Sequence, residues 1–187
     1  YIVLTGRGPF CRSMGTITKK RDPARTTGGK AERRTGHITI GSEETIMRDY
    51  FGYAGKTVVV TGASSGMGEA AGKMLVDLGA EVHAVGNRKK ITYGPAREYY
   101  YDLSEKAALD ALIAELPGKI DALFICQGIS QGINSNLLVQ KVNFLSQKYL
   151  AERLASRIVD NGSVTLISSN GGFGWEQNFA LCREVID

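Results

Sequence analysis

The stretch that decides the fold is Lys56-Thr-Val-Val-Val-Thr-Gly-Ala-Ser-Ser-Gly-Met-Gly68, where an apolar β-branched run stops at a glycine-rich turn. The pattern predicts a strand over 57–61, a Gly-x-x-x-Gly-x-Gly turn and the start of a helix. We expect Gly62 to permit the sharp turn, Gly66 to let the backbone approach a pyrophosphate, and Gly68 to let the helix pack closely on the sheet. Free N–H groups and the positive end of the helix dipole would then face the phosphates. The alternative is a tight turn that binds no ligand.

Apolar residues recur at helical spacing after the turn, which predicts a helix over 67–78. The apolar face of this helix consists of Met67, Ala70, Ala71, Met74, Leu75 and Leu78. Both methionines are therefore expected in the core.

Strand and helix patterns alternate along the rest of the chain. Further strands are expected over 81–85, 98–101, 120–126 and 163–168, and helices over 104–116, with Ser104 as N-cap, and 136–159. In the last helix the residues expected on one face are Leu138, Val142, Leu145, Tyr149 and Leu154. The alternation predicts an α/β fold, a doubly wound parallel sheet of the Rossmann type. A ligand would then lie at the carboxyl edge of the strands at 57–61, 120–126 and 163–168.

The composition is that of one domain with a hydrophobic core, in a chain of 187 residues. No apolar stretch approaches the roughly 18 residues of a membrane span. The three cysteines, Cys11, Cys126 and Cys182, are odd in number and widely spaced. Such spacing argues against a zinc site or a disulfide framework. We therefore expect a cytoplasmic protein with no metal and no membrane partner.

Residues 1–46 differ from the rest of the chain. They carry nine Lys or Arg and four Asp or Glu residues, whereas residues 47–187 carry 14 and 15. The segment lacks hydrophobic periodicity and is expected to be a disordered basic extension. We expect it to be non-native upstream sequence, with Met47 as the true start and 47–187 as the N-terminal part of a nucleotide-binding domain. A nucleic-acid-binding arm is disfavoured because aromatic residues do not interleave with the basic ones.

Five short motifs occur in the order and spacing of the short-chain dehydrogenase/reductase family. They are Thr61-Gly-Ala-Ser-Ser-Gly-Met-Gly68, Asp102-Leu103, Cys126-Gln-Gly128, Asn143 and Ile167-Ser-Ser169. The chain resembles this family over residues 55–187. The run from Ser168 to Asn178 is similar to the 3α-hydroxysteroid dehydrogenase/carbonyl reductase and coniferyl-alcohol dehydrogenase group. The resemblance implies an NAD(P)-dependent oxidoreductase that transfers a hydride between nicotinamide and a steroid-like or aromatic secondary alcohol or ketone.

The resemblance also implies roles for individual residues. Ser169 would donate a hydrogen bond to the reacting oxygen, and Asn143 would organise a water in the proton relay. Asp102 would accept from the adenine amino group. The cofactor-binding residues expected in all are Gly62, Ser64, Ser65, Gly66, Met67, Gly68, Asn87, Arg88, Asp102, Leu103 and Gly128. The alternatives are a strand-end hydroxyl for Ser169, a helix-face amide for Asn143 and a helix cap for Asp102, and position favours the functional roles of Ser169 and Asn143.

The residues after the second strand bear on the choice of cofactor. An acid at the end of that strand usually accepts from the ribose 2′-OH of NAD, but Val85-Gly-Asn-Arg-Lys-Lys90 contains none. Its basic side chains would attract a 2′-phosphate, so NADP(H) is favoured and NAD(H) is the alternative. A solvated basic turn is the other interpretation.

The general acid of the family, a Tyr followed four residues later by a Lys, is absent from this sequence. Tyr93 and Tyr149 have Arg at that spacing, but both precede Ser169. Phe179 and Arg183 repeat the spacing without an acidic proton. The sequence therefore predicts a C-terminally truncated chain that binds a nucleotide without efficient catalysis, or an inactive fragment.

Three further expectations follow from the resemblance. A helical substrate lid would begin near Phe173, with residues 179–186 as its first helix, and the pocket formed largely by that lid would define the substrate. Dimers or tetramers of the full-length parent would form through the helix at 136–159. Gln127 stands where the family prefers a small residue, and would either bond the ribose or crowd it.

Overall fold

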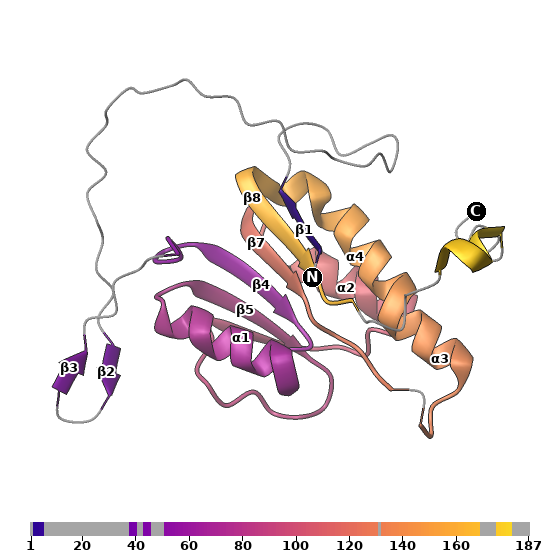
Figure 1. Cartoon of the computed structure of the whole chain (residues 1–187). Coiled ribbons are helices and arrows are strands. Elements are labelled where there is room, and N and C mark those ends of the chain that lie inside the picture. The colour runs from indigo at the N-terminus through magenta and orange to yellow at the C-terminus, as the bar shows by residue number, and fades with distance from the viewer. Residues whose placement is uncertain are drawn as a thin grey trace.

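The computed structural model describes residues 2–5, 38–40, 43–45, 51–130, 132–168 and 175–180. A six-stranded sheet has the order β1-β8-β7-β4-β5-β6, and β4 to β8 run parallel (Figure 1). The strands are β1 Ile2–Thr5, β4 Thr57–Thr61, β5 Glu81–Gly86, β6 Arg97–Tyr100, β7 Ile120–Ile125 and β8 Ile158–Leu166, while β2 Ile38–Ile40 and β3 Glu43–Thr45 form a separate antiparallel pair. The helices are α1 Gly66–Asp77, α2 Lys106–Glu115, α3 Asn136–Gln140, the π-helical turn η1 Lys141–Leu145, α4 Ser146–Leu154, and the 3-10 turns η2 Ala155–Arg157 and η4 Trp175–Asn178. The predicted doubly wound parallel sheet is confirmed.

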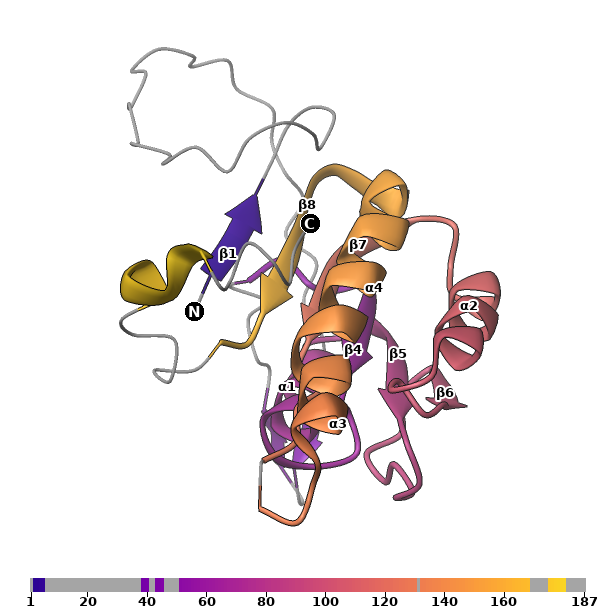
Figure 2. The same ribbon diagram turned by 90° about the vertical axis from the view of Figure 1, so that its right-hand side faces the viewer.

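Helices cover both faces of the sheet. Alternate side chains of a strand point to opposite faces, so Val58 and Val60 pack with Leu75 of α1. Val59 points the other way and packs in a cluster with Leu112 of α2 and the leucines of α4. Figure 2 shows α2 and α4 together on one side of the sheet.

The strand order places the carboxyl ends of β4, β7 and β8 side by side. Cys126 N donates to Thr61 O at 3.2 Å, and Ile167 N donates to Ile125 O at 3.2 Å, so the pairing continues past the strand ends. From β4 the chain winds outward to β5 and β6 on one side, then returns to β7 and β8 on the other. This reversal creates a topological switch point, where ligands of such sheets bind.

The buried face of α1 differs from the predicted one. Gly68 and Gly72 are buried in this helix, whereas Met67 and Met74 are 56% and 58% exposed. The prediction that both methionines lie in the core is wrong. Because the glycines bring the helix backbone close to its neighbours, the larger side chains are turned outward.

The helix predicted over 136–159 ends at Arg157, and Ile158 begins β8. Its interior contains the π-helical turn Lys141–Leu145, which holds more residues than an α-helical turn. Leu145, expected on the inner face, is the last residue of this turn and is 45% exposed. The residues buried in α4 are Ser146, Gln147, Leu150 and Leu154.

Part of the N-terminal segment forms a strand. β1 pairs antiparallel with the outer edge of β8, with Ile2 opposite Leu166. An open sheet edge offers unpaired N–H and C=O groups, and Ile2-Val-Leu-Thr5 is an apolar run with high strand propensity. Residues 2–5 therefore form a strand where the sequence predicted disorder. Met47 lies outside the described residues, so the boundary there stays a prediction.

Replacing Leu112 by Ala should lower the free energy of unfolding by about 2–5 kcal/mol, because this fully buried side chain joins α2 to the sheet. Urea denaturation followed by circular dichroism measures the change. Leu137→Ala is the control, since Leu137 is 67% exposed and should change stability by less than about 0.5 kcal/mol. Equal losses in the two variants would contradict the described core.

Candidate nucleotide-binding site

The turn after β4 is held by two glycines that have no room for a side chain. A Cβ on Gly62 would lie 2.7 Å from the backbone nitrogen of Gln127, and one on Gly68 would lie 2.3 Å from the carbonyl oxygen of Gly62. Gly62 and Gly66 also have positive φ angles of 68° and 56°, which favour glycine. A Cβ on Gly66 would meet no atom within 4 Å among the described residues. The turn is therefore closed at its base and open at its tip.

The open tip coincides with the N-terminus of α1. The helix begins at Gly66, and the side chain of Ser65 at the N-cap makes no capping hydrogen bond. The first N–H groups of a helix have no partner within it, and the helix dipole adds positive potential there. Ser65 and Met67 are exposed, and Ser64 is half-buried. These predicted residues lie at the N-terminus of α1. A helix N-terminus of this kind binds a phosphate group through its free N–H groups and its dipole.

The end of β5 lies beside the turn. Ala63 N donates to Val85 O at 2.9 Å, and the exposed Asn87 and Arg88 follow the end of the strand. Lys89 is paired with Glu69 of α1 at 3.5 Å. Arg88 makes no ion pair within the part of the chain that the structure describes, so its guanidinium is available to an anion.

Asp102 organises the turn after β6. Its Oδ1 accepts from the backbone nitrogen of Ser104 at 3.0 Å and from the Ser104 hydroxyl at 2.7 Å. These hydrogen bonds hold the pKa of Asp102 below its usual value. The expected N-cap role of Ser104 is wrong, because its hydroxyl is engaged by Asp102 and α2 begins only at Lys106. Leu103 is buried, and the adenine contacts expected of Asp102 and Leu103 stay predictions.

The segment after β7 is fixed by the side chain of Asn143, in the π-helical turn. Asn143 Oδ1 accepts from Ile129 N at 2.8 Å, and its Nδ2 donates to Ile129 O at 2.9 Å. A Cβ on the neighbouring Gly128 would make an ordinary contact, 3.7 Å from Asn143 Oδ1. The amide therefore anchors the loop beside Gly128. The proton-relay role of Asn143 stays a prediction.

Gln127 faces inward. Its side chain is buried, accepts from the Thr61 hydroxyl and donates to Ser146 Oγ at 3.2 Å. Both groups of its amide are thus engaged inside the protein, which favours neither of the two interpretations left open by the sequence. The sequence signal for this arrangement was a glutamine where the resembled family prefers a small residue. Its hydrogen-bond partners could be identified only from the fold.

Of the two residues expected to be catalytic, the structure describes Asn143 but not Ser169. β8 ends at the same edge of the sheet as the glycine turn, and Ser169 lies outside the described residues, as does most of the expected lid helix. The hydroxyl of Tyr93 is buried, and burial, together with Glu69 and Glu98, raises the pKa of Tyr93 to about 12. A general acid works best with a pKa near the operating pH, so Tyr93 is unsuited to that role.

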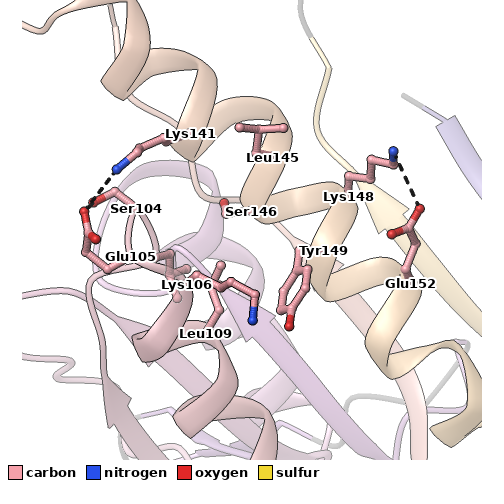
Figure 3. Close-up of a pocket in the computed structure, with 11 residues that line it drawn as sticks. Ser104, Glu105, Lys106, Leu109, Lys141, Leu145, Ser146, Lys148, Tyr149 and Glu152 are labelled. Atoms are coloured by element: carbon pink, nitrogen blue, oxygen red, sulfur yellow. Dashed lines mark hydrogen bonds and ion pairs between the residues drawn. The ribbon is translucent and has the colours of Figure 1, made fainter. Parts of the chain in front are cut away.

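A separate cavity of about 440 Å³ lies between the start of α2 and the α3–α4 helix (Figure 3). Lys141 is paired with Glu105 at 3.3 Å, and Lys148 with Glu152 at 4.0 Å. Leu103, one of the predicted cofactor-binding residues, also lines this cavity. The glycine turn does not line this cavity, so it is not the candidate phosphate site.

Within the described ranges, no cluster of three or more His, Cys, Asp or Glu side chains is placed to hold a metal. No helix there has the length and apolar character needed to cross a bilayer.

Gly68→Ala should weaken the binding of a reduced nicotinamide dinucleotide by at least about tenfold, because its Cβ must displace the carbonyl oxygen of Gly62. Titration of the fluorescence of the bound reduced nicotinamide measures the affinity. Gly118→Ala is the matched control, since a Cβ there meets no described atom within 4 Å. Unchanged affinity in Gly68→Ala would place the dinucleotide elsewhere.

The chain is similar in sequence to known proteins. The sequence pattern of the NAD dependent epimerase/dehydratase family matches residues 58–183. Coniferyl-alcohol dehydrogenase from Pseudomonas sp. (strain HR199 / DSM 7063) is 37% identical over 131 residues, which are 70% of this chain and 50% of that protein. The chain therefore spans about half the length of this curated relative.

Solved structures share the fold. The Pseudomonas aeruginosa RhlG/NADP active-site complex is 25% identical with a TM-score of 0.52, over 59% of this chain and 51% of that chain. A variant short-chain dehydrogenase/reductase from Serratia marcescens is 21% identical with a TM-score of 0.56, over 72% of this chain and 65% of that chain. Because the family pattern covers most of the chain and the glycine turn lies at the switch point of a parallel sheet, this chain belongs to the NAD dependent epimerase/dehydratase family, as a short-chain dehydrogenase/reductase.

Proposed function

We propose that the chain binds NADP(H) at the glycine turn. We propose further that it is part of an oxidoreductase that interconverts a secondary alcohol and a ketone. The observation that carries the proposal is the open tip at Gly66, set between two closely packed glycines at the N-terminus of α1. Such an N-terminus binds phosphate groups through its free N–H groups and its dipole. When bound, the nicotinamide would accept or supply the hydride.

The described residues would bind and orient the dinucleotide. The N–H groups of the first turn of α1 would hold the pyrophosphate, and Asp102, already ionised, would accept from the adenine amino group. Arg88, exposed at the end of β5, would pair with a ribose 2′-phosphate. Asn143 would hold the loop at Ile129 in place, and Ser169 would donate to the reacting oxygen.

An aromatic or steroid-like substrate is part of the proposal. Its support is the 37% identity to a protein named coniferyl-alcohol dehydrogenase. A cytoplasmic location and assembly through the long helix are proposed on the family resemblance alone.

Nucleotide binding without turnover is the second candidate function. The sequence contains no Tyr followed four residues later by a Lys. Tyr149, one of the two tyrosines with an Arg at that spacing, has its hydroxyl bonded to Asp110 in the helical layer. A redox-sensing or regulatory nucleotide binder on this fold would have these properties.

Binding and turnover measured on the same sample separate the two candidates. We expect NADPH to bind to the purified chain, and we expect slow or no reduction of aromatic ketones in its presence. Calorimetry gives the affinity, and absorbance of the reduced nicotinamide gives the rate. Efficient turnover would favour the oxidoreductase outright, and no binding of NADPH or NADH would contradict both candidates.

Arg88→Ala should weaken the binding of NADPH by about tenfold or more, because a charge-assisted hydrogen bond to the 2′-phosphate is lost. The affinity for NADH, which lacks that phosphate, should change less than about twofold. Lys119→Ala, an exposed cation before β7, is the control. Equal losses for the two nucleotides would contradict a 2′-phosphate contact.

A further inference from the structure

Gln127 stands where the chain leaves β7 and passes the glycine turn. The side chain is 7% exposed, and its amide is engaged at both ends. The oxygen Oε1 accepts from the hydroxyl of Thr61, the last residue of β4, and Nε2 donates to Oγ of Ser146, the first residue of α4, at 3.2 Å. One side chain thus joins the strand that ends at the turn to the long helix.

The hydrogen bonds form a directed series. The Ser146 hydroxyl donates in turn to the carbonyl oxygen of Val142 at 2.8 Å, one residue before Asn143 in the π-helical turn. The series therefore runs without a break from the end of β4 to this turn. Thr61 and Ser146 are 0% and 1% exposed, and a buried polar group without a partner is strongly unfavourable.

We propose that Gln127 is a positioning residue that couples the glycine turn to the π-helical turn carrying Asn143. This inference deepens the proposed function and rests on it, because the turn that Gln127 ties is the proposed pyrophosphate site. The loop after Gln127 is held at two more points. Gln147 Nε2 donates to Gln127 O at 2.8 Å, and Asn143 bonds both backbone groups of Ile129. A displacement of Gln127 is thereby passed on to the anchor at Asn143.

A small residue at this position cannot make the link. Thr61 would retain only the carbonyl oxygen of Phe124, 3.4 Å away, and Ser146 would lose its donor. The nucleotide turn and Asn143 are expected to respond to each other through Gln127.

The test compares Gln127→Met, which keeps the length of the side chain and removes both hydrogen bonds, with Gln140→Met, an exposed glutamine of α3. Hydrogen exchange by NMR reports on the amide of Ile129, whose bond to Asn143 should loosen. The amide of Tyr101, which donates to Gly86 O at 3.0 Å, is the internal reference. In Gln127→Met we expect exchange at Ile129 to rise about tenfold, and exchange at Tyr101 to stay unchanged.

The affinity for NADPH should fall by about tenfold in the same variant and stay unchanged in Gln140→Met. Ser146→Ala cuts the series at its other end and should give the same selective change at Ile129, which keeps the test valid if Gln127→Met does not fold. Gln127→Glu is the conservative variant. A protonated carboxyl carries an acceptor and a donor in the same places, so protection of Ile129 should return as the pH falls and that Glu becomes neutral.

Unchanged exchange at Ile129 overturns the proposal. Equal acceleration at Ile129 and Tyr101 also overturns it, since that pattern reports a general loss of stability. The exchange measurement needs no nucleotide, so it stands apart from the proposed function. Failure of the wild-type chain to bind NADPH or NADH would contradict the nucleotide site, while the exchange rate at Ile129 would still decide the link from Thr61 to Asn143.

Discussion

The close approach of α1 to the end of β4 is the constraint on which the rest of the site depends. A Cβ on Gly68 would lie 2.3 Å from the carbonyl oxygen of Gly62, so Gly68 tolerates no side chain without movement of the backbone. This contact fixes the direction in which the helix leaves the sheet. Because the helix starts there, its free N–H groups point to the edge where β4, β7 and β8 end, and the site forms at that edge.

The second organising feature is the π-helical turn Lys141–Leu145. It interrupts an otherwise continuous helix and brings Asn143 to the loop after β7, where its amide bonds Ile129 on both sides. Such turns often mark functional positions, because an extra residue re-aims a side chain at some loss of helix stability. Here the re-aimed side chain anchors a loop at the edge of the sheet.

Much of the fold was predictable from sequence. The strand–turn–helix at residues 56–68 and the alternation of strands and helices indicate a doubly wound sheet, and the strand order confirms it. The buried faces were less predictable. Periodicity alone placed Met67 and Met74 inside, since it cannot show that glycines at 68 and 72 form the packing surface. It also missed the π-helical turn, which has no composition of its own and shifts the phase of the buried residues in α4.

The candidate site follows the same division. Glycines with special backbone needs are visible in sequence, because no other residue type suits them. Partnerships between distant side chains are not visible. The series from Thr61 through Gln127 to Ser146 joins segments 66 and 19 residues apart, and only the packing of α4 on the sheet brings them together.

The outward position of the methionines of α1 bears on oxidative chemistry. Met67 and Met74 are more than half exposed, so peroxide has ready access to their sulfur atoms. Conversion of a buried methionine to its sulfoxide places a polar group in a core and disrupts it. On the outer side of α1 the added oxygen meets solvent, so the helix can keep its glycine-lined contact with the sheet while these two residues are oxidised. The packing that fixes α1 against the sheet thus also keeps the sulfur atoms of Met67 and Met74 away from the core.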